Sequence, residues 1–322
     1  MSRRILLVSV FFLVVFSFTF GECFAGAKYP EKKIRLVLAF APGGGSDMTG
    51  RALTRYVNPY LDKRVYAENV VGGGGAIGFR EGAKASPDGY TLTMMVTSLT
   101  VGPHMVKDFP SYDLFDPICL VAVDPVTLTV KLDSSFKTVK DLISYAKAHP
   151  GMVSVSHAGV GTVTHLEIEA FGEAIGAKFN LVPYQGSNPA LIAAAGGHVD
   201  AAASGCSEAM SLIEGKKLRP LITFGNKRSR LYPDVPMAKE LGYDVVIYLW
   251  RGIGVPKGTP NEVQDVLVEA FRKAIEDEEC KKLMGQMGLE TIYLASEEAR
   301  RWLKDQSDFF KSTVIKAGLQ IK

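Results

Sequence analysis

Glycines and hydroxyl side chains that follow a short apolar run are the first residues in this chain that can do chemistry. The run 34–40 is followed by Gly43-Gly44-Gly45-Ser46-Asp47, and apolar residues then recur at helical spacing from Met48 to Val57. A strand, a glycine turn and a helix start in this order can bind an anion. Glycine lets the backbone come close to a ligand, and the first amides of a helix are unpaired. The alternative is a tight turn whose glycines serve packing only, and this stretch alone leaves both open.

A second stretch repeats the pattern. The short strand 153–155 leads into a loop with Gly159, Gly161 and Thr162. Thr164 and Glu167 then fit a capping box, which predicts a helix start at that point. Two such loops in distant parts of the chain predict one binding site with a half contributed by each of two lobes.

Three further hydroxyls follow predicted strands. Thr97 and Ser98 come directly after the strand 90–96, and Ser204 comes directly after the strand 199–203. In α/β proteins, ligands bind at the carboxyl ends of the strands, so these side chains are candidate ligand contacts. Ser207 is expected to cap the next helix rather than to bind a ligand.

Several chemistries are disfavoured. Gly73, Gly75 and Gly78 match a dinucleotide fingerprint, but the acidic residue required about 20 positions later is absent, so a close turn packed near the first loop is expected. The sequence contains no metal-ligand spacing, nucleophile elbow or paired acid and base, so we expect neither an enzyme nor a bound cofactor or metal. Turnover of a carboxylate ester or amide would revive the enzyme alternative.

The N-terminus reads as an export signal. Arg3 and Arg4 precede an apolar run at 5–20, and Ala25-Gly26-Ala27 offers a cleavage site, so residues 1–27 are predicted to be a signal peptide. Glu22 before Cys23 argues against lipid attachment at that cysteine.

Residues 28–322 carry 35 Lys and Arg against 33 Asp and Glu, a near balance that argues against a nucleic-acid partner. Cys119, Cys206 and Cys280 allow at most one disulfide, and free buried thiols are expected. Two apolar segments, 118–123 and 126–130, are separated by Asp124-Pro125, and two amphipathic helices are predicted to end the chain.

Short motifs spread over most of the chain resemble the solute-binding proteins of tripartite tricarboxylate transporters, the Bug-type family. The order and spacing of these motifs carry the resemblance: Tyr29-Pro30, Ala41-Pro42-Gly43-Gly44-Gly45-Ser46-Asp47, Pro87-Asp88-Gly89-Tyr90, Gly159-Val160-Gly161-Thr162, Val182-Pro183-Tyr184-Gln185-Gly186, Asp234-Val235-Pro236 and Pro256-Lys257-Gly258-Thr259-Pro260.

The resemblance implies an α/β fold, a two-lobed periplasmic binding protein of the type II-like, Venus flytrap kind with two crossover hinge strands. The crossings are expected near Val123 and Gly225. Lobe 1 would then comprise residues 28–123 plus 226–322, and lobe 2 would comprise residues 124–225.

The resemblance also implies that backbone amides and hydroxyls of the two loops grip a carboxylate. Together with the hydroxyls at strand ends, the predicted ligand-binding residues are Gly44, Gly45, Ser46, Asp47, Thr97, Ser98, Gly161, Thr162, Thr164, His165 and Ser204. Asp47 is expected to cap its helix or to order a water rather than to touch the carboxylate. Arg251 departs from the family, and either faces the cleft, where it could pair with a second carboxylate, or is a surface cation, the alternative that we favour.

The function that the resemblance implies is transport. A periplasmic monomer would capture a di- or tricarboxylate, or a carboxylate-bearing amino or aromatic acid, and deliver it to membrane permease subunits. The alternative is an extracytoplasmic sensor that presents its ligand to a membrane receptor kinase.

Overall fold

The computed structural model describes residues 29–320, so the predicted signal peptide at 1–27 lies outside the described residues. The strands are β1 (Ile34–Leu38), β2 (Val65–Asn69), β3 (Thr91–Val96), β4 (Phe115–Lys131), β5 (Ser154–His157), β6 (Asn180–Pro183), β7 (Ala201–Gly205), β8 (Leu218–Thr223), β9 (Tyr248–Pro256) and β10 (Glu290–Ala295). The α-helices are α2 (Gly45–Val57), α3 (Ala76–Lys84), α4 (Ser98–Met105), α5 (Val139–Ala148), α6 (Val163–Ile175), α7 (Ser187–Gly196), α8 (Cys206–Glu214), α9 (Asn261–Glu276), α10 (Glu278–Gln286) and α11 (Ser296–Lys316).

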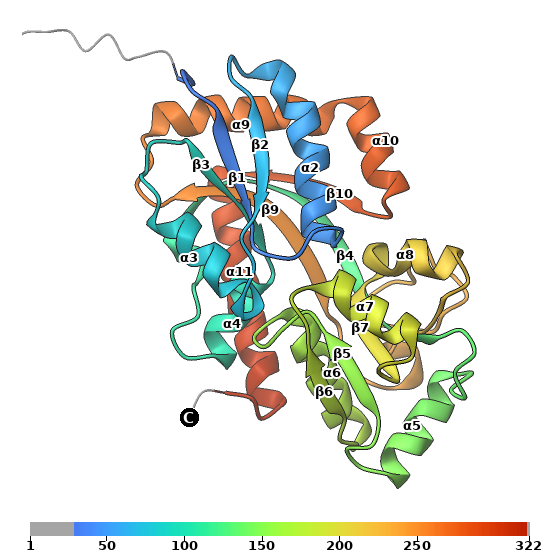
Figure 1. Cartoon of the computed structure of the whole chain (residues 1–322). Helices are drawn as coiled ribbons and strands as arrows, with labels where there is room; N and C mark the ends of the chain where they lie inside the picture. The colour runs from blue at the N-terminus through green and yellow to red at the C-terminus, as the bar shows by residue number, and fades with distance from the viewer. Residues whose placement is uncertain (1–28, 321–322) are drawn as a thin grey trace, which may run out of the picture.

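The strands form one mixed sheet that bends from one half of the molecule into the other. The strand order is β2-β1-β3-β9-β4-β7-β5-β6, and both β8 and β10 pair with β4 off this path. β1 is parallel to its two neighbours, as β5 is to its own. Figure 1 shows the two resulting halves, with the blue and orange elements in one and the green and yellow elements in the other.

The long strand β4 joins the two lobes. Its first part pairs with β9 and β10, and from Val126 onward it pairs with β7 and β8. The first lobe has its core around β1, β3 and β9, with Phe79, Trp250 and Phe271 fully buried. The second lobe has its main core around β5 and the second half of β4, with Leu166 and Phe171 buried. The two-lobed α/β architecture predicted from the sequence is therefore present.

Two details of chain organisation differ from the expectation. Asp124 and Pro125 do not separate two segments but lie within the continuous strand β4, where Pro125 pairs with Tyr248 of β9. The chain ends with α9, α10, β10 and α11 rather than with two helices. The short polar helix α10 was missed because its few buried side chains, Cys280 and Met284, give no long amphipathic stripe.

Buried side chains beyond Gly225 bear on where the chain returns to the first lobe. Phe224, Val245 and Ile247 are buried in the second core, so side chains well beyond Gly225 still pack with β4 and α6. The predicted lobe boundaries stay a prediction, and the packing favours a return to the first lobe at the start of β9.

Cys119, Cys206 and Cys280 are free and buried, as predicted. Within residues 29–320, no helix has both the length and the apolar character needed to cross a membrane.

Candidate functional site

A small cavity of about 30 Å³ lies between the two lobes. Its first-lobe wall is built by Phe40, Gly44, Gly45, Ser46, Val96 and Ser98, with Leu249 from β9, and its second-lobe wall is built by Ala158, Thr162, Val163, Thr164, Ser187 and Glu208. Water molecules need roughly 10–15 Å³ of such volume each, so the cavity has room for about two. A small carboxylate is larger, so its entry requires the lobes to separate.

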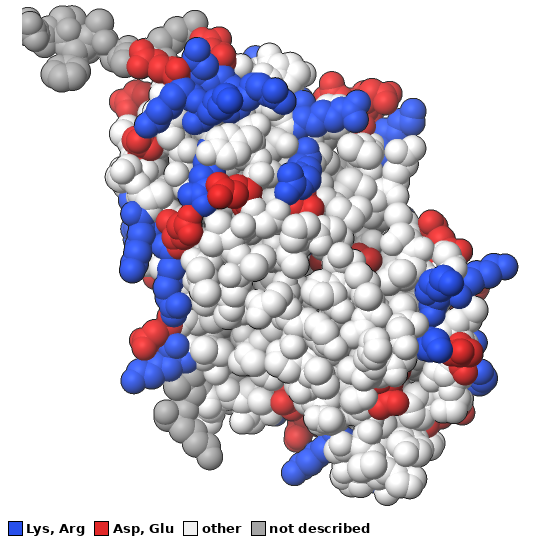
Figure 2. Space-filling model, viewed as in Figure 1, with Lys and Arg blue, Asp and Glu red and all other residues white. Residues whose placement is uncertain are grey.

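Four helices begin at this cavity, and a fifth, α8, adds Glu208 of its first turn to the wall. The first turns of α2 and α4 face it from the first lobe, and those of α6 and α7 face it from the second. Each helix N-terminus carries unpaired amides and a partial positive charge, so together they favour an anion. No Lys or Arg side chain is among the lining residues. Figure 2 shows charged side chains gathered towards the top and the edges of the face in view, with a largely uncharged centre.

The first loop has no side-chain cap of its own. The N-cap of α2 is Gly44, whose φ of −82° and ψ of 171° are extended, and this residue has no side chain that could bond the first amides of the helix. Gly43 has a φ of +80°, a conformation that favours glycine. Asp47 turns away from the cavity, because its Oδ2 accepts from the Gly43 amide at 3.0 Å and its Oδ1 accepts from Arg51 Nε at 2.8 Å. Asp47 therefore orders the loop from inside α2 and is not the helix cap that the sequence suggested.

The second loop is held by its own hydroxyls. Thr162 is the N-cap of α6: its Oγ1 accepts from the His165 amide at 3.3 Å and donates to the Gly159 carbonyl at 2.6 Å. Oγ1 of Thr164 accepts from the Ala158 amide at 3.0 Å. The capping box predicted for Thr164 and Glu167 is wrong by two residues, since the helix starts at Val163 and Glu167 lies inside it.

Glu167 is fully buried, and neither of its carboxyl oxygens has a hydrogen-bond partner among the described residues. Burial, with a smaller contribution from the nearby Glu208, raises its pKa well above the ordinary value. Burial thus favours the neutral form of the Glu167 side chain.

Two stacked histidines lie beneath the second loop. The His157 and His165 rings are 4.9 Å apart, and His157 Nδ1 lies 3.0 Å from the Gly159 carbonyl oxygen. Burial and then the charge of His165 lower the pKa of His157 to about 4, so it is neutral at pH 7. Nδ1 of His165 accepts from the Gly161 amide at 3.3 Å. Both histidines support the loop from behind the cavity wall.

The structure brings six of the predicted site residues together. Gly44, Gly45, Ser46, Ser98, Thr162 and Thr164 line the cavity, whereas Asp47, Thr97, Gly161, His165 and Ser204 do not. Thr97 lies under β9, with its Oγ1 accepting from the Trp250 amide at 2.7 Å, and Ser204 is buried inside β7. Gly161 packs towards Val106 and Phe109. Contact of any of these residues with a ligand stays a prediction.

The sequence reasoning missed seven lining residues, of which two are polar. Ser187 begins α7 and follows the strand β6, so the rule used for Ser98 would have found it. Glu208 lies in the first turn of α8, three residues after its N-cap Gly205, and that spacing is a signal available in the sequence. The other missed residues are apolar: Phe40, Val96, Ala158, Val163 and Leu249.

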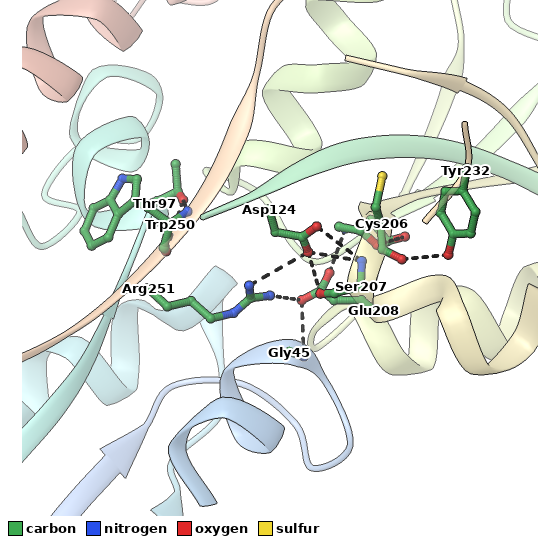
Figure 3. A network of polar contacts seen from close by, with 11 residues as sticks. Gly45, Thr97, Asp124, Cys206, Ser207, Glu208, Tyr232, Trp250 and Arg251 are labelled. Carbon is green, nitrogen blue, oxygen red and sulfur yellow. Dashed lines mark hydrogen bonds and ion pairs between the residues drawn. The ribbon is translucent and has the colours of Figure 1, made fainter. Parts of the chain in front are cut away.

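A buried ion network adjoins the cavity (Figure 3). Arg251 Nη2 lies 3.0 Å from Glu208 Oε1, and Arg251 Nη1 lies 3.8 Å from Asp124 Oδ2. Only 1% of the Arg251 side chain is exposed, so the surface-cation alternative favoured for this residue is wrong. Ser207 is not the predicted cap, because it lies inside α8 and its hydroxyl donates to Asp124 Oδ2 at 2.5 Å.

Asp124 is the carboxylate of this network whose ionisation is most perturbed. Complete burial raises its pKa to about 7, although Arg251 and the hydrogen bonds from Ser207 act in the opposite direction. Arg251 is thus left with Glu208 as its nearest carboxylate partner, at 3.0 Å.

Direct contacts between the lobes close the cavity. The Ala41 amide donates to the Gln185 carbonyl at 3.1 Å, and Asn188 Nδ2 donates to the Pro42 carbonyl at 3.1 Å. The glycine turn at 72–75 lies near the first loop, as predicted, with Gly75 close to Phe40. It also reaches the second lobe, because a Cβ on Gly74 would lie 2.2 Å from the Val160 carbonyl oxygen. Because Gly74 has no Cβ, the backbones of the two lobes can approach this closely in the closed arrangement.

The comparisons with known proteins bear on this geometry. Residues 50–319 match the model of the family described as "Tripartite tricarboxylate transporter family receptor". The chain belongs to this family. It is 33% identical over 294 residues to a Cupriavidus necator protein described as "UPF0065 protein in gbd 5'region", covering 91% of this chain and 89% of that one. It is 30% identical over 299 residues to Protein BugT of Bordetella pertussis, covering 91% and 92%.

Solved structures agree. The periplasmic binding protein BugD superposes with a TM-score of 0.87 at 30% identity, covering 91% of this chain and all of that one. An R. palustris protein solved with adipate gives a TM-score of 0.85 at 26% identity, covering 90% and 98%. The family resemblance and the periplasmic-binding-protein fold inferred from the sequence are confirmed. The matched family is described as a transporter receptor and BugD as a periplasmic binding protein, which confirms the prediction that the chain is not an enzyme.

Proposed function

We propose that this protein is a periplasmic solute-binding protein that captures a small carboxylate in the cavity between its lobes and delivers it to the membrane permease subunits of a tripartite tricarboxylate-type transporter. The observation that carries the proposal is the convergence of four helix N-termini, two from each lobe, on one cavity with several hydroxyls in its wall. Such a site stabilises an anion through fixed dipoles and hydrogen bonds without a lysine or arginine in its wall.

The mechanism is capture by closure. In an open form, each lobe presents half of the donors, and only closure lets a carboxylate touch both halves. The ligand then shifts the population towards the closed form by its differential affinity for that form. The family description names a transporter receptor, which favours delivery to a permease over the sensor alternative.

The test is binding of mono-, di- and tricarboxylates, acidic amino acids and aromatic acids to purified protein freed of bound ligand, followed by thermal shift and calorimetry. A ligand that binds only the folded protein raises its melting temperature by an amount set by the ratio of ligand concentration to Kd. The triple variant Ser46→Ala, Ser98→Ala, Ser187→Ala removes three hydroxyls from the cavity wall and is expected to weaken binding at least tenfold. Ser211→Ala, on the exposed face of α8, is the matched control. Absence of binding by every carboxylate would overturn the proposal.

A further inference from the structure

Among the described residues that line the cavity, Glu208 is the one with a charged side chain, and it already fills an anion position. Its Oε1 accepts from the Gly45 amide at the start of α2 at 3.2 Å, and its Oε2 accepts from the Gly205 amide at 2.8 Å. Glu208 belongs to the second lobe and Gly45 to the first, so this carboxylate bridges the cleft (Figure 3). The α2 amide that would bind a ligand carboxylate is therefore occupied by one from the chain itself.

The guanidinium of Arg251 is likewise paired with Glu208 rather than free to bind a ligand. Its Nη2 pairs with Glu208 Oε1 at 3.0 Å and lies against the backbone of Gly45, where a Cβ would be 2.0 Å away. Its Nε and Nη1 have no hydrogen-bond partner among residues 29–320. A buried guanidinium with spare donors would attract a second ligand carboxylate strongly. Here Glu208 stands between Arg251, which does not line the cavity, and any ligand in it.

We propose that Glu208 is a specificity-determining residue that limits the ligand to a single carboxylate. The inference rests on the proposed function, that the cavity binds a carboxylate. The single carboxylate would bind at the hydroxyls and helix ends away from Glu208, with Ser98, Thr164 and Ser187 as the candidate partners. A second carboxylate would meet the like charge of Glu208 in a water-poor cleft and would find the Gly45 amide and Arg251 taken, whereas an uncharged ligand end meets no such repulsion.

The first experiment uses the wild-type protein. Calorimetry at pH 7.5 would compare linear mono- and dicarboxylates of equal carbon number, from three to seven carbons, together with benzoate and terephthalate. The monocarboxylate of the best-binding pair is expected to bind at least tenfold more tightly than its dicarboxylate. Equal or tighter binding of the dicarboxylate would overturn the inference while leaving the proposed function standing. Absence of binding by all of these compounds, and by the tricarboxylates and acidic amino acids of the wider screen, would overturn both.

The second experiment releases Arg251. Glu208→Gln keeps an acceptor for the Gly45 amide but removes the negative charge, so dicarboxylates are expected to gain at least tenfold in affinity while monocarboxylates change by less than about threefold. Glu214→Gln, exposed at the far end of α8, should leave the ratio unchanged. An unchanged ratio in folded Glu208→Gln would overturn the inference.

A double variant serves as a control for misfolding caused by an unpaired Arg251. Glu208→Gln combined with Arg251→Met leaves no buried cation without a partner, and it should lose the dicarboxylate gain because no guanidinium remains. Retention of the gain in this double variant would contradict the role assigned to Arg251 and, with it, the inference.

Discussion

The two loops that face each other across the cleft reach the same result by different means. The second loop is organised from within: the Thr162 hydroxyl caps α6, and the Thr164 hydroxyl holds the Ala158 amide. The first loop has no side-chain cap on α2, and its Gly45 amide finds an acceptor only in Glu208 of the other lobe. The second loop is therefore held by contacts within its own lobe, whereas the Gly45 amide of the first loop takes its acceptor from the other lobe.

The largest expected effect comes from the place where the second loop meets the first lobe. Gly73 and Gly74 have nearly the same left-handed φ, +59° and +64°, so alanine strains both alike. Only at Gly74 would the added Cβ meet the Val160 carbonyl oxygen, at 2.2 Å, because the nearest atom at Gly73 is 3.5 Å away. Gly74→Ala is expected to hold the lobes apart and to weaken ligand binding at least tenfold, as measured by calorimetry.

Gly73→Ala serves as the control for this prediction, with an expected change in Kd of less than about threefold. Small-angle scattering with saturating ligand should show a larger radius of gyration for Gly74→Ala than for Gly73→Ala. Equal affinities for the two variants would show that the approach of Gly74 to Val160 does not govern closure.

The second prediction concerns the pH dependence of stability that His157, beneath the second loop, gives to the protein. The pKa of His157 in the folded protein, about 4, lies below its unfolded value of about 6.5. The neutral form is favoured by folding, so the stability that it contributes is complete above pH 6.5 and is lost as pH falls towards 4. At about 1.4 kcal/mol per unit of pKa difference, the loss is on the order of 3 kcal/mol.

His157→Asn should remove this loss, and urea unfolding of both proteins at pH 7 and pH 4.5 would measure it. Asp124 titrates in the same range with the opposite sign, because its raised pKa makes folding more favourable as pH falls from about 7 towards 4. The difference between wild type and His157→Asn cancels that contribution. A variant as acid-sensitive as the wild type would place the sensitivity elsewhere.

A smaller effect is expected at the helix caps. Thr162→Val removes the side-chain cap of α6 and the hydrogen bond to the Gly159 carbonyl, and it should lower the free energy of unfolding by about 1–2 kcal/mol. Urea titration measures this directly. A loss below about 0.3 kcal/mol would mean that the second loop does not depend on its own cap.

The smallest effect is expected at the matching position of the first loop. Gly44 has an extended backbone, and a Cβ there would be 3.6 Å from its nearest neighbour, the Ala41 carbonyl oxygen. Gly44→Ser supplies the missing cap without strain and should raise the free energy of unfolding by a few tenths of a kcal/mol. Destabilisation by serine would contradict the view that this cap is simply absent.

The contrast between the two loops also explains which parts of the site could be predicted from the sequence. Both loops were predicted because strand, glycine and hydroxyl, and helix start are neighbours in the sequence, and local geometry follows from local chemistry. Glu208 was missed as a site residue because its spacing from Gly205 marks only a helix start, whereas its partner Gly45 is 163 residues away. Arg251 was assigned to the surface because a single cation in a strand carries no sign of the two carboxylates that bury it.

The cap of α6 shows a different limit of prediction from the sequence. Thr162 and Thr164 are two residues apart, and the hydroxyl of either could cap a helix. The spacing from Thr164 to Glu167 favoured Thr164, whereas the cap in the structure is Thr162. Tertiary packing decided between them, because Glu167 is fully buried in the interior instead of reaching back to a helix end.

The most direct measurement is a crystal structure of the protein with its best-binding carboxylate. We expect one ligand carboxylate between the lobes, within hydrogen-bond distance of first-turn amides or hydroxyls from a helix of each lobe, with Arg251 still paired to Glu208. A ligand held by one lobe alone, or bound outside the cavity lined by Ser98, Thr164 and Ser187, would contradict capture between the two loops.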